Sequence, residues 1–151
     1  MKICTTLLLM TSLFSVAMAQ SKTASLNLLV GTYTQPGKSE GIYVYNFNPA
    51  TGELTPKTEM KGIKNPTFLA VSKDKKFVYA VSETSEGTVN AYSFDPKTGQ
   101  LMFLNSATSG GGGPCYVAVD DKRKFVYTGN YGGGSLTAIP LKSDGSLGSD
   151  V

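Results

Sequence analysis

The sequence repeats itself at a spacing of about 47 residues. Residues 66–79 align without a gap with residues 114–127, and both segments end in Phe-Val-Tyr. Residues 45–54 align in the same way with residues 92–101 and share the pattern Tyr-x-Phe-x-Pro-x-Thr-Gly-x-Leu. A shorter match, Asp-Gly-Ser-Leu at residues 144–147, follows one period later. Repetition at a fixed period indicates one small structural unit that is copied along the chain.

The complete repeat unit contains four segments with the character of β-strands. They lie at residues 68–72, 77–82, 88–94 and 101–106 and are rich in apolar, aromatic and β-branched side chains. The first two are nearly continuous apolar runs, which is typical of strands covered on both faces. Segments rich in Gly, Pro, Asp and Lys separate the four and can reverse the chain. A repeat of about 40–50 residues that contains four antiparallel strands is the signature of a propeller blade.

We therefore expect an all-β fold, a β-propeller of four-stranded antiparallel blades. The alternative is a β-sandwich of about seven to ten strands, which has similar turn spacing but gives no reason for a repeated sequence. The first unit begins at its second strand, residues 26–34, and the third stops after its third strand, residues 136–141. This predicts an incomplete propeller of about two to three blades, since closure needs at least about four. The open blade faces would favour self-association.

Residues 1–19 have the features of a secretory signal peptide. Lys2 supplies the positive charge, residues 7–16 are largely apolar, and Ala-Met-Ala at residues 17–19 reads as a processing site. The apolar stretch is too short for a membrane-spanning helix, which takes about 20 residues. We therefore expect an exported protein, periplasmic or secreted, with residues 20–151 as the partial propeller. The alternative is a buried N-terminal helix.

The charge of the chain argues against two classes of partner. Removal of Lys2 leaves 13 of the 14 basic residues against 11 acidic ones, a net charge of +2. This bias is too weak to indicate nucleic acid or an anionic membrane as a partner.

Of the two cysteines only Cys115 would remain in the mature chain, which excludes an intramolecular disulfide.

Two kinds of loop are expected to meet at one end of the channel of a propeller: those before the innermost strand of a blade and those after its second strand. Residues 64–66 and 110–114 belong to the first kind, and residues 83–87 and 130–134 to the second. Glycine runs in two of these loops could cradle an anion, but we favour flexible turns between blades. Each candidate could instead be a strand-end residue that satisfies its own turn. The candidate ligand-binding residues are Tyr33, Glu83, Tyr116, Asn130 and Tyr131.

The residues available for catalysis are few. The chain has no histidine, which removes the commonest general base and the commonest metal ligand. Cys115 has no histidine partner and is interpreted as a small buried hydrophobic residue. Arg123 is predicted at the opposite end of its blade. Glu83, the carboxylate expected at the channel mouth, is therefore the candidate general base, and we expect no metal or other cofactor.

Five segments together resemble the lactonase family of seven-bladed β-propellers. They are Val-Gly-Thr-Tyr-Thr at residues 30–34, Ser-Glu-Gly-Ile-Tyr at 39–43, Pro-Thr-Phe-Leu-Ala-Val-Ser at 66–72, Gly-Pro-Cys-Tyr-Val-Ala-Val-Asp at 113–120, and Gly-Asn-Tyr-Gly-Gly-Gly-Ser at 129–135. This family includes 6-phosphogluconolactonases of the propeller type and carboxymuconate cyclases. The resemblance extends over essentially all of the chain after the signal peptide and implies the N-terminal portion of such a propeller.

The resemblance implies hydrolysis of a sugar lactone, such as 6-phosphogluconolactone, to the aldonate in carbohydrate metabolism. Water would attack the ring carbonyl, and no metal is required. The family usually has His-Pro-Cys-His where this chain has Gly-Pro-Cys-Tyr at residues 113–116, and its further His, Arg and Glu candidates lie in later blades. We therefore expect the 151-residue chain to be inactive by itself. The alternative is a non-catalytic exported fragment that binds carbohydrate or protein.

The signal peptide should be removed after Ala19. Intact-mass spectrometry of the mature protein from its native host should then show a chain that starts at Gln20. The expected cleavage follows from the small residues at positions 17–19 behind an apolar segment. Soluble cytoplasmic protein that retains Met1 would contradict the export prediction.

Overall fold

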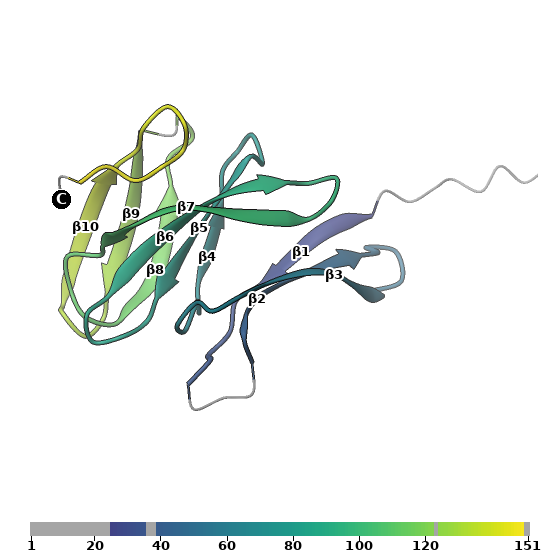
Figure 1. The fold of residues 1–151 in the computed structure, drawn as a ribbon, viewed down its shortest axis with the longest axis horizontal. Coiled ribbons are helices and arrows are strands. Elements are labelled where there is room, and N and C mark those ends of the chain that lie inside the picture. Colours follow the sequence, from purple (N-terminus) through teal and green to yellow (C-terminus); the bar gives the residue numbers. More distant parts are fainter. Residues whose placement is uncertain (1–24, 36–38, 123, 150–151) are drawn as a thin grey trace, which may run out of the picture.

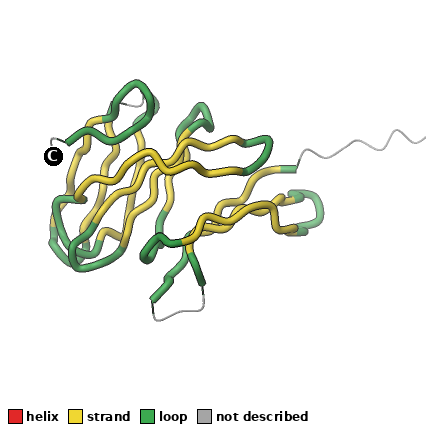
Figure 2. Tube along the Cα trace, viewed as in Figure 1, coloured by secondary structure: helices red, strands yellow, loops and turns green. Residues whose placement is uncertain are grey.

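The computed structural model describes residues 25–35, 39–122 and 124–149. These residues form ten β-strands, and within the same ranges no helix is present (Figure 2), so none could cross a membrane as an apolar helix. The predicted signal peptide and Arg123 lie outside the described residues. The strands are β1 (Leu26–Val30), β2 (Gly41–Phe47), β3 (Leu54–Lys61), β4 (Leu69–Val71), β5 (Phe77–Ser82), β6 (Thr88–Asp95), β7 (Gln100–Thr108), β8 (Pro114–Val119), β9 (Phe125–Asn130) and β10 (Ser135–Pro140).

The strands form three antiparallel sheets that follow one another along the chain (Figure 1). The first sheet has the order β1-β2-β3, the middle sheet β4-β5-β6-β7, and the third sheet β10-β9-β8. The hairpin predicted from residues 68–72 and 77–82 is present as β4 and β5, with Leu69 opposite Ala80. The all-β fold and the four-stranded repeat unit predicted from the sequence are thus confirmed, and the described parts of the other two units contribute three strands each.

The repeated Asx-Pro-x-Thr-Gly segment is a hairpin turn in both places where it occurs. Between β6 and β7, Asp95 accepts a hydrogen bond of 2.9 Å from the backbone N–H of Lys97, which lowers the pKa of the Asp95 carboxyl group. Between β2 and β3, Asn48 accepts the corresponding backbone N–H at 3.0 Å. Gly99 and Gly52 close the two turns with φ angles of 79° and 75°, which glycine adopts without steric cost.

The middle sheet is covered on both faces, and this explains the continuous apolar run of β5. On one face Val78 packs with Ile42 of β2, and on the other face Tyr79 and Val81 pack with Val117 of β8. All five side chains are at most 2% exposed. Because successive residues of a strand point to opposite faces, both sets of β5 positions must be apolar when both faces are buried.

The turn after β10 fastens the third sheet to the middle sheet. The side-chain amide of Asn105 donates to the backbone oxygen of Leu147, and the backbone N–H of Leu147 donates back to the Asn105 Oδ1, both at 2.8 Å. Leu147 is 1% exposed and forms an isolated β-bridge with Leu141. The short sequence match at residues 144–147 therefore reflects a turn that buries a leucine, as Leu101 is buried after the preceding turn.

The outer faces of the first and third sheets carry exposed apolar side chains that no described residue covers. Leu26 on β1 is 51% exposed and Leu136 on β10 is 76% exposed. Large apolar patches of this kind favour association, and self-association through the two faces stays a prediction. Further exposed apolar side chains of these two sheets are Leu28 and Val30 on β1 and Phe125 and Tyr127 on β9.

Two positions on β10 test how the third sheet packs. Ile139→Ala removes a side chain that is 0% exposed, so it should lower the free energy of unfolding by about 2–5 kcal/mol. Leu136→Ala changes the outer face of the same strand and should alter it by less than about 0.5 kcal/mol. Urea unfolding followed by circular dichroism measures both values. Equal losses in the two variants would contradict the packing of the third sheet on the middle one.

Candidate functional site

The loops between β5 and β6, β7 and β8, and β9 and β10 meet at one end of the sheets, as the repeat predicts. The backbone N–H of Gly113 donates to the Thr84 oxygen, and that of Tyr131 donates to the Gly113 oxygen, both at 2.9 Å. Glycine is required at this contact, because a Cβ atom on Gly112 would lie 2.7 Å from the backbone oxygen of Ser85. The glycine run thus serves the close packing of neighbouring loops.

A carboxylate with two hydroxyl partners lies in the loop after β5. The Tyr33 hydroxyl donates to the Oε1 of Glu83 at 2.7 Å, and the Thr67 hydroxyl donates to the Oε2 at 2.6 Å. Tyr33 follows β1 and Thr67 precedes β4, so the first and middle sheets both contribute to this group. A carboxylate offers about four acceptor positions, and Glu83 therefore keeps room for a water or a ligand hydroxyl. We call Tyr33, Thr67 and Glu83 the Glu83 cluster.

Asn65 positions the Glu83 cluster. Its side-chain amide donates to the backbone oxygen of Glu83 at 3.1 Å, and its own backbone oxygen accepts the Glu83 N–H at 3.0 Å. Its Oδ1 accepts the backbone N–H of Thr34, the neighbour of Tyr33, at 2.9 Å. Asn65 has a φ angle of 44°, a left-handed conformation that asparagine adopts more readily than most residues. One side chain thus joins the segments that carry Tyr33 and Glu83.

The Glu83 carboxylate raises the pKa of Tyr33. The hydrogen bond between the two side chains is the main cause, and the negative charge of Glu83 acts in the same direction. The phenol therefore keeps its proton throughout the neutral range, and it remains the donor in this hydrogen bond. Tyr33 is 56% exposed, so the pair is accessible to a ligand.

An aromatic pair lies beside the Glu83 cluster. The rings of Tyr116 and Phe68 are 5.0 Å apart between centroids, at an angle of 47°. Tyr116 is 50% exposed and Phe68 is 39% exposed, and Phe68 directly follows Thr67 in the chain. The pair offers an aromatic surface with a phenol group at its edge, which suits a ligand with both apolar and polar parts.

The two remaining candidate residues form none of the hydrogen bonds of the Glu83 cluster. Asn130 is 2% exposed, and its amide donates to the backbone oxygen of Ser109 at 2.8 Å. Its Oδ1 is buried and has no hydrogen-bond partner among the described residues. Tyr131 is 88% exposed. Asn130 therefore connects the third sheet to the linker after β7, whereas Tyr131 extends from the loop after β9 into solvent.

The interpretation of Cys115 as a buried residue is wrong. Cys115 is a free, exposed cysteine. The register between β8 and β9 shifts between Pro114 and Tyr116, and Cys115 is the unpaired residue at this irregularity. A bulge of this kind breaks the alternation between the two faces of a strand, which the sequence does not reveal. Among the residues that the structure describes, no group of three or more His, Cys, Asp or Glu side chains could hold a metal ion.

Thr67 and Asn65 are missing from the candidates chosen by sequence. The repeat aligns Thr67 with Cys115, so it contains no signal for a hydroxyl group there. It aligns Asn65 with Gly113, and both residues have a positive φ angle. Asparagine and glycine at equivalent positions indicate a left-handed backbone, which could have identified Asn65 as a residue with a structural role in the loop.

Known proteins share both the sequence and the fold of this chain. The family described as "Lactonase, 7-bladed beta-propeller" matches residues 27–151. The chain is 41% identical over 124 residues to the 6-phosphogluconolactonase of Bacillus subtilis. The aligned segment covers 81% of this chain and 35% of that protein. The chain is 30% identical over 123 residues to the 6-phosphogluconolactonase of Formosa agariphila, with 80% and 35% covered. The chain thus spans about a third of the length of these relatives.

Two solved structures support the same assignment. A Bacteroides fragilis protein considered to be a 6-phosphogluconolactonase superposes with a TM-score of 0.79 at 41% identity, over 87% of this chain and 36% of that one. A periplasmic gluconolactonase of Pseudomonas aeruginosa superposes with a TM-score of 0.77 at 31% identity, over 83% and 37%. From the match of residues 27–151 and this agreement in fold, the chain belongs to the lactonase family of seven-bladed β-propellers.

Proposed function

We propose that this chain is part of an enzyme that hydrolyses a sugar lactone, such as 6-phosphogluconolactone, to the aldonate. The observation that carries the proposal is the family match over residues 27–151. Two aligned relatives bear the name 6-phosphogluconolactonase, which supports a phosphorylated sugar lactone as the substrate. The Glu83 cluster supplies an accessible carboxylate at the channel end where such a substrate would bind.

Lactone hydrolysis requires a base that takes a proton from the attacking water and a donor that stabilises the oxyanion. We propose Glu83 as this base, since two of its acceptor positions remain open. Tyr33 and Thr67 hold its carboxylate in one orientation, and the exposed rings of Tyr116 and Phe68 could support the lactone ring. The oxyanion donor would come from parts of the propeller outside the described residues.

Binding without catalysis is the second candidate function. Both oxygens of Glu83 already accept a hydrogen bond, which occupies acceptor positions that a catalytic water would use. The chain also has no histidine that could take over this role. A carboxylate held by two hydroxyl groups beside exposed aromatic rings is well suited to bind the hydroxyl groups of a carbohydrate. The chimeric enzyme described below distinguishes the two functions.

We further propose that the protein acts outside the cytoplasm. The sequence of residues 1–19 supports export. The gluconolactonase of Pseudomonas aeruginosa, which shares the fold, is described as periplasmic. Cleavage after Ala19 in the native host is the direct test of this proposal.

A chimeric enzyme tests the catalytic proposal. In this chimera, residues 27–151 replace the aligned segment of the Bacillus subtilis 6-phosphogluconolactonase. We expect hydrolysis of 6-phosphogluconolactone above the buffer background, measured as acid release in a pH-stat. Glu83→Gln should lower kcat by about 10²–10⁴-fold, because a glutamine cannot take up the proton. Glu53→Gln, which changes an exposed carboxylate in the β2–β3 turn, is the matched control and should leave kcat unchanged.

The results of this experiment separate the two candidate functions. Full activity of the folded Glu83→Gln chimera would exclude Glu83 as the base. A folded chimera without activity would favour the binding function. The 151-residue chain assayed by itself should match the buffer background, because the Glu83 cluster lacks a donor for the oxyanion. If that chain hydrolysed the lactone and Glu83→Gln abolished the activity, the Glu83 cluster would not need an oxyanion donor from another part of the propeller.

Titration of Tyr33 tests whether Glu83 is coupled to it in solution. Glu83→Gln should lower the raised pKa of Tyr33 towards the ordinary phenol value of about 10, because the amide carries no negative charge. The hydrogen bond exists while Tyr33 is protonated and should be lost as the pH rises through this pKa. NMR of 13C-labelled tyrosine measures the pKa, with Tyr33→Phe to assign the signal. An identical pKa in the wild type and in Glu83→Gln would contradict the coupling.

A further inference from the structure

A pocket lies between the first sheet and the middle sheet. It has a volume of about 450 Å³, within the range of about 300–1,000 Å³ that is usual for small-molecule sites. The end of β3, the linker that follows it, and strands β6 and β7 form its walls. Ser82 and Thr84, the two sequence neighbours of Glu83, line it, whereas Glu83 does not. The pocket is therefore distinct from the Glu83 cluster.

Two buried polar side chains line this pocket and keep unused hydrogen-bonding capacity. Tyr92 is 1% exposed, and its hydroxyl has no hydrogen-bond partner among the described residues. Burial raises the pKa of Tyr92, so the hydroxyl remains a donor. Asn90 is 9% exposed, and its amide donates to the Ser82 hydroxyl at 3.0 Å, which leaves its Oδ1 free to accept a hydrogen bond. Neither atom is among the described buried polar atoms that lack a partner, so both reach the open space of the pocket, where water or a ligand can pair with them.

The interface between the middle and third sheets has a different arrangement at the equivalent positions. There Thr137 occupies the position of Asn90, and Asn130 that of Ser82. The backbone oxygen of Ser109 accepts hydrogen bonds from the Asn130 amide at 2.8 Å and from the Thr128 hydroxyl at 3.3 Å. A main-chain oxygen of the linker thus accepts hydrogen bonds from two polar side chains of β9.

The corresponding linker between the first and middle sheets is one residue shorter. It runs from residue 62 to residue 65 before Pro66, whereas its counterpart runs from residue 109 to residue 113 before Pro114. Gly62 has the position of Ser109, and the two backbone N–H groups make equivalent hydrogen bonds, to the oxygens of Glu40 and Gly87, both at 3.1 Å. Three residues of the shorter linker, Gly62, Ile63 and Lys64, line the pocket.

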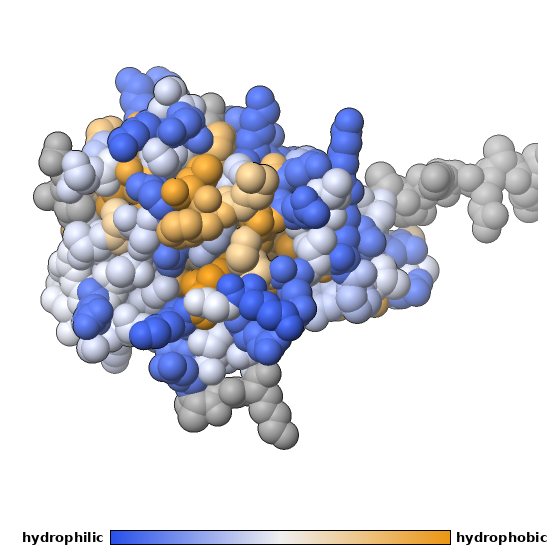
Figure 3. Space-filling model, in the orientation of Figure 1, coloured by the Kyte–Doolittle hydropathy of each residue, from blue (hydrophilic) through white to orange (hydrophobic). Residues whose placement is uncertain are grey.

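One wall of the pocket is aromatic. The rings of Tyr92 and Phe103 meet edge to face, 5.8 Å apart between centroids and at an angle of 62°. Phe103 on β7 is 57% exposed, and Figure 3 shows hydrophobic atoms in the middle of this face of the molecule, near β7, with hydrophilic groups on both sides. An aromatic wall next to amide and hydroxyl groups suits a ligand with an apolar face and hydroxyl groups at its edge.

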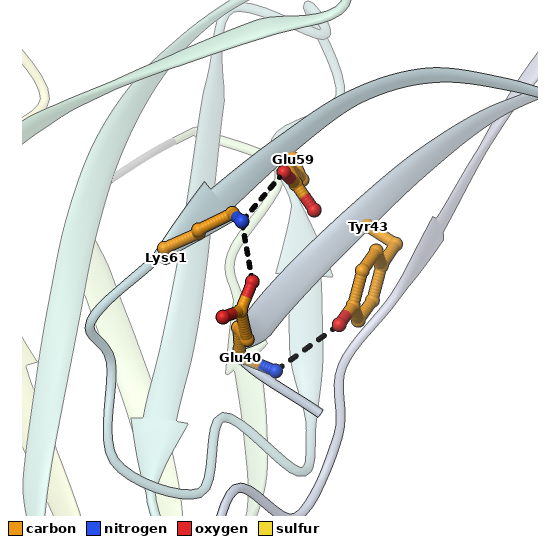
Figure 4. A network of polar contacts seen from close by, with 4 residues as sticks. All are labelled: Glu40, Tyr43, Glu59 and Lys61. Carbon is orange, nitrogen blue, oxygen red and sulfur yellow. Dashed lines mark hydrogen bonds and ion pairs between the residues drawn. The ribbon is translucent and has the colours of Figure 1, made fainter. Parts of the chain in front are cut away.

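Two lysines and three glutamates carry the charges on and beside the pocket, so positive charge is not in excess. Lys61 forms ion pairs with Glu40 and with Glu59, the latter at 3.0 Å (Figure 4), and these partners raise its pKa. Its charge is therefore already neutralised. The other charged residues of the lining are Lys64 and Glu86, one of each sign. A phosphate or carboxylate ligand would find no uncompensated positive charge, so the pocket favours a neutral ligand.

We propose that this pocket binds a neutral monosaccharide in its pyranose form. The Tyr92 hydroxyl donates to one sugar hydroxyl, the Oδ1 of Asn90 accepts from another, and the ring of Phe103 packs against the carbon face of the sugar. All residues that line the pocket belong to the first two sheets or their connecting loops, so the site does not require further blades. It is also independent of the lactone hydrolysis proposed for the channel end.

Saturation-transfer NMR with methyl β-D-glucopyranoside and the full chain tests the proposal. We expect saturation transfer to the glucoside and amide shift changes at Lys64, Thr84 and Thr88. Tyr92→Phe keeps the buried ring and removes the hydroxyl, so it should weaken binding by about 3- to 10-fold. Phe103→Ala removes an exposed ring and should weaken binding to a similar extent. Tyr127→Phe removes a tyrosine hydroxyl from the outer face of β9 and is the matched control.

Three results would overturn the proposal. The first is no saturation transfer from the folded wild-type chain. The second is equal binding by the wild type, Tyr92→Phe and Phe103→Ala. The third is binding that Glu83→Gln abolishes while Tyr92→Phe retains it, because the glucoside would then bind at the Glu83 cluster. Amide spectra of each variant establish that it is folded before its affinity is compared.

Discussion

The packing of the middle sheet on both of its faces is the interaction on which the rest of this structure depends. Val78 and Tyr79 are consecutive residues of β5, and each is fully buried against a different neighbouring sheet. This arrangement places three sheets face to face with their equivalent strand ends together. The loops that leave those ends must then lie side by side, and both the Glu83 cluster and the pocket between the first two sheets result from that.

Close contact between the loops restricts which residues they can contain. Gly112 has no space for a side chain beside Ser85, and Asn65 adopts a left-handed backbone while its side chain connects two sheets. In return, the loops hold Glu83 in a defined position with a hydroxyl group on each oxygen. The same framework that stabilises the fold thus orients the carboxylate proposed to act on a lactone.

The two interfaces between sheets differ although the sequences that form them repeat. Between the middle and third sheets, the oxygen of Ser109 satisfies the buried Asn130 amide. Between the first and middle sheets, a linker shorter by one residue leaves Tyr92 and Asn90 facing a pocket of about 450 Å³. The shorter linker and the different side chains at equivalent positions, such as Asn90 in place of Thr137, thus accompany the candidate ligand site in one interface and not in the other.

The sequence by itself determined the class of fold and most of the strands, because strand pairing and burial leave a repeated local pattern. Residues 77–82 could be recognised as a strand buried on both faces, and the Asp95 and Asn48 turns by their shared pattern. It also placed Tyr33 and Glu83 at the same end of the sheets. Only the tertiary structure decided that the Tyr33 hydroxyl reaches Glu83, that Asn130 is buried, and that a bulge exposes Cys115. These outcomes depend on which side chains from distant segments meet, and on local shifts in register, neither of which leaves a periodic signal in the sequence.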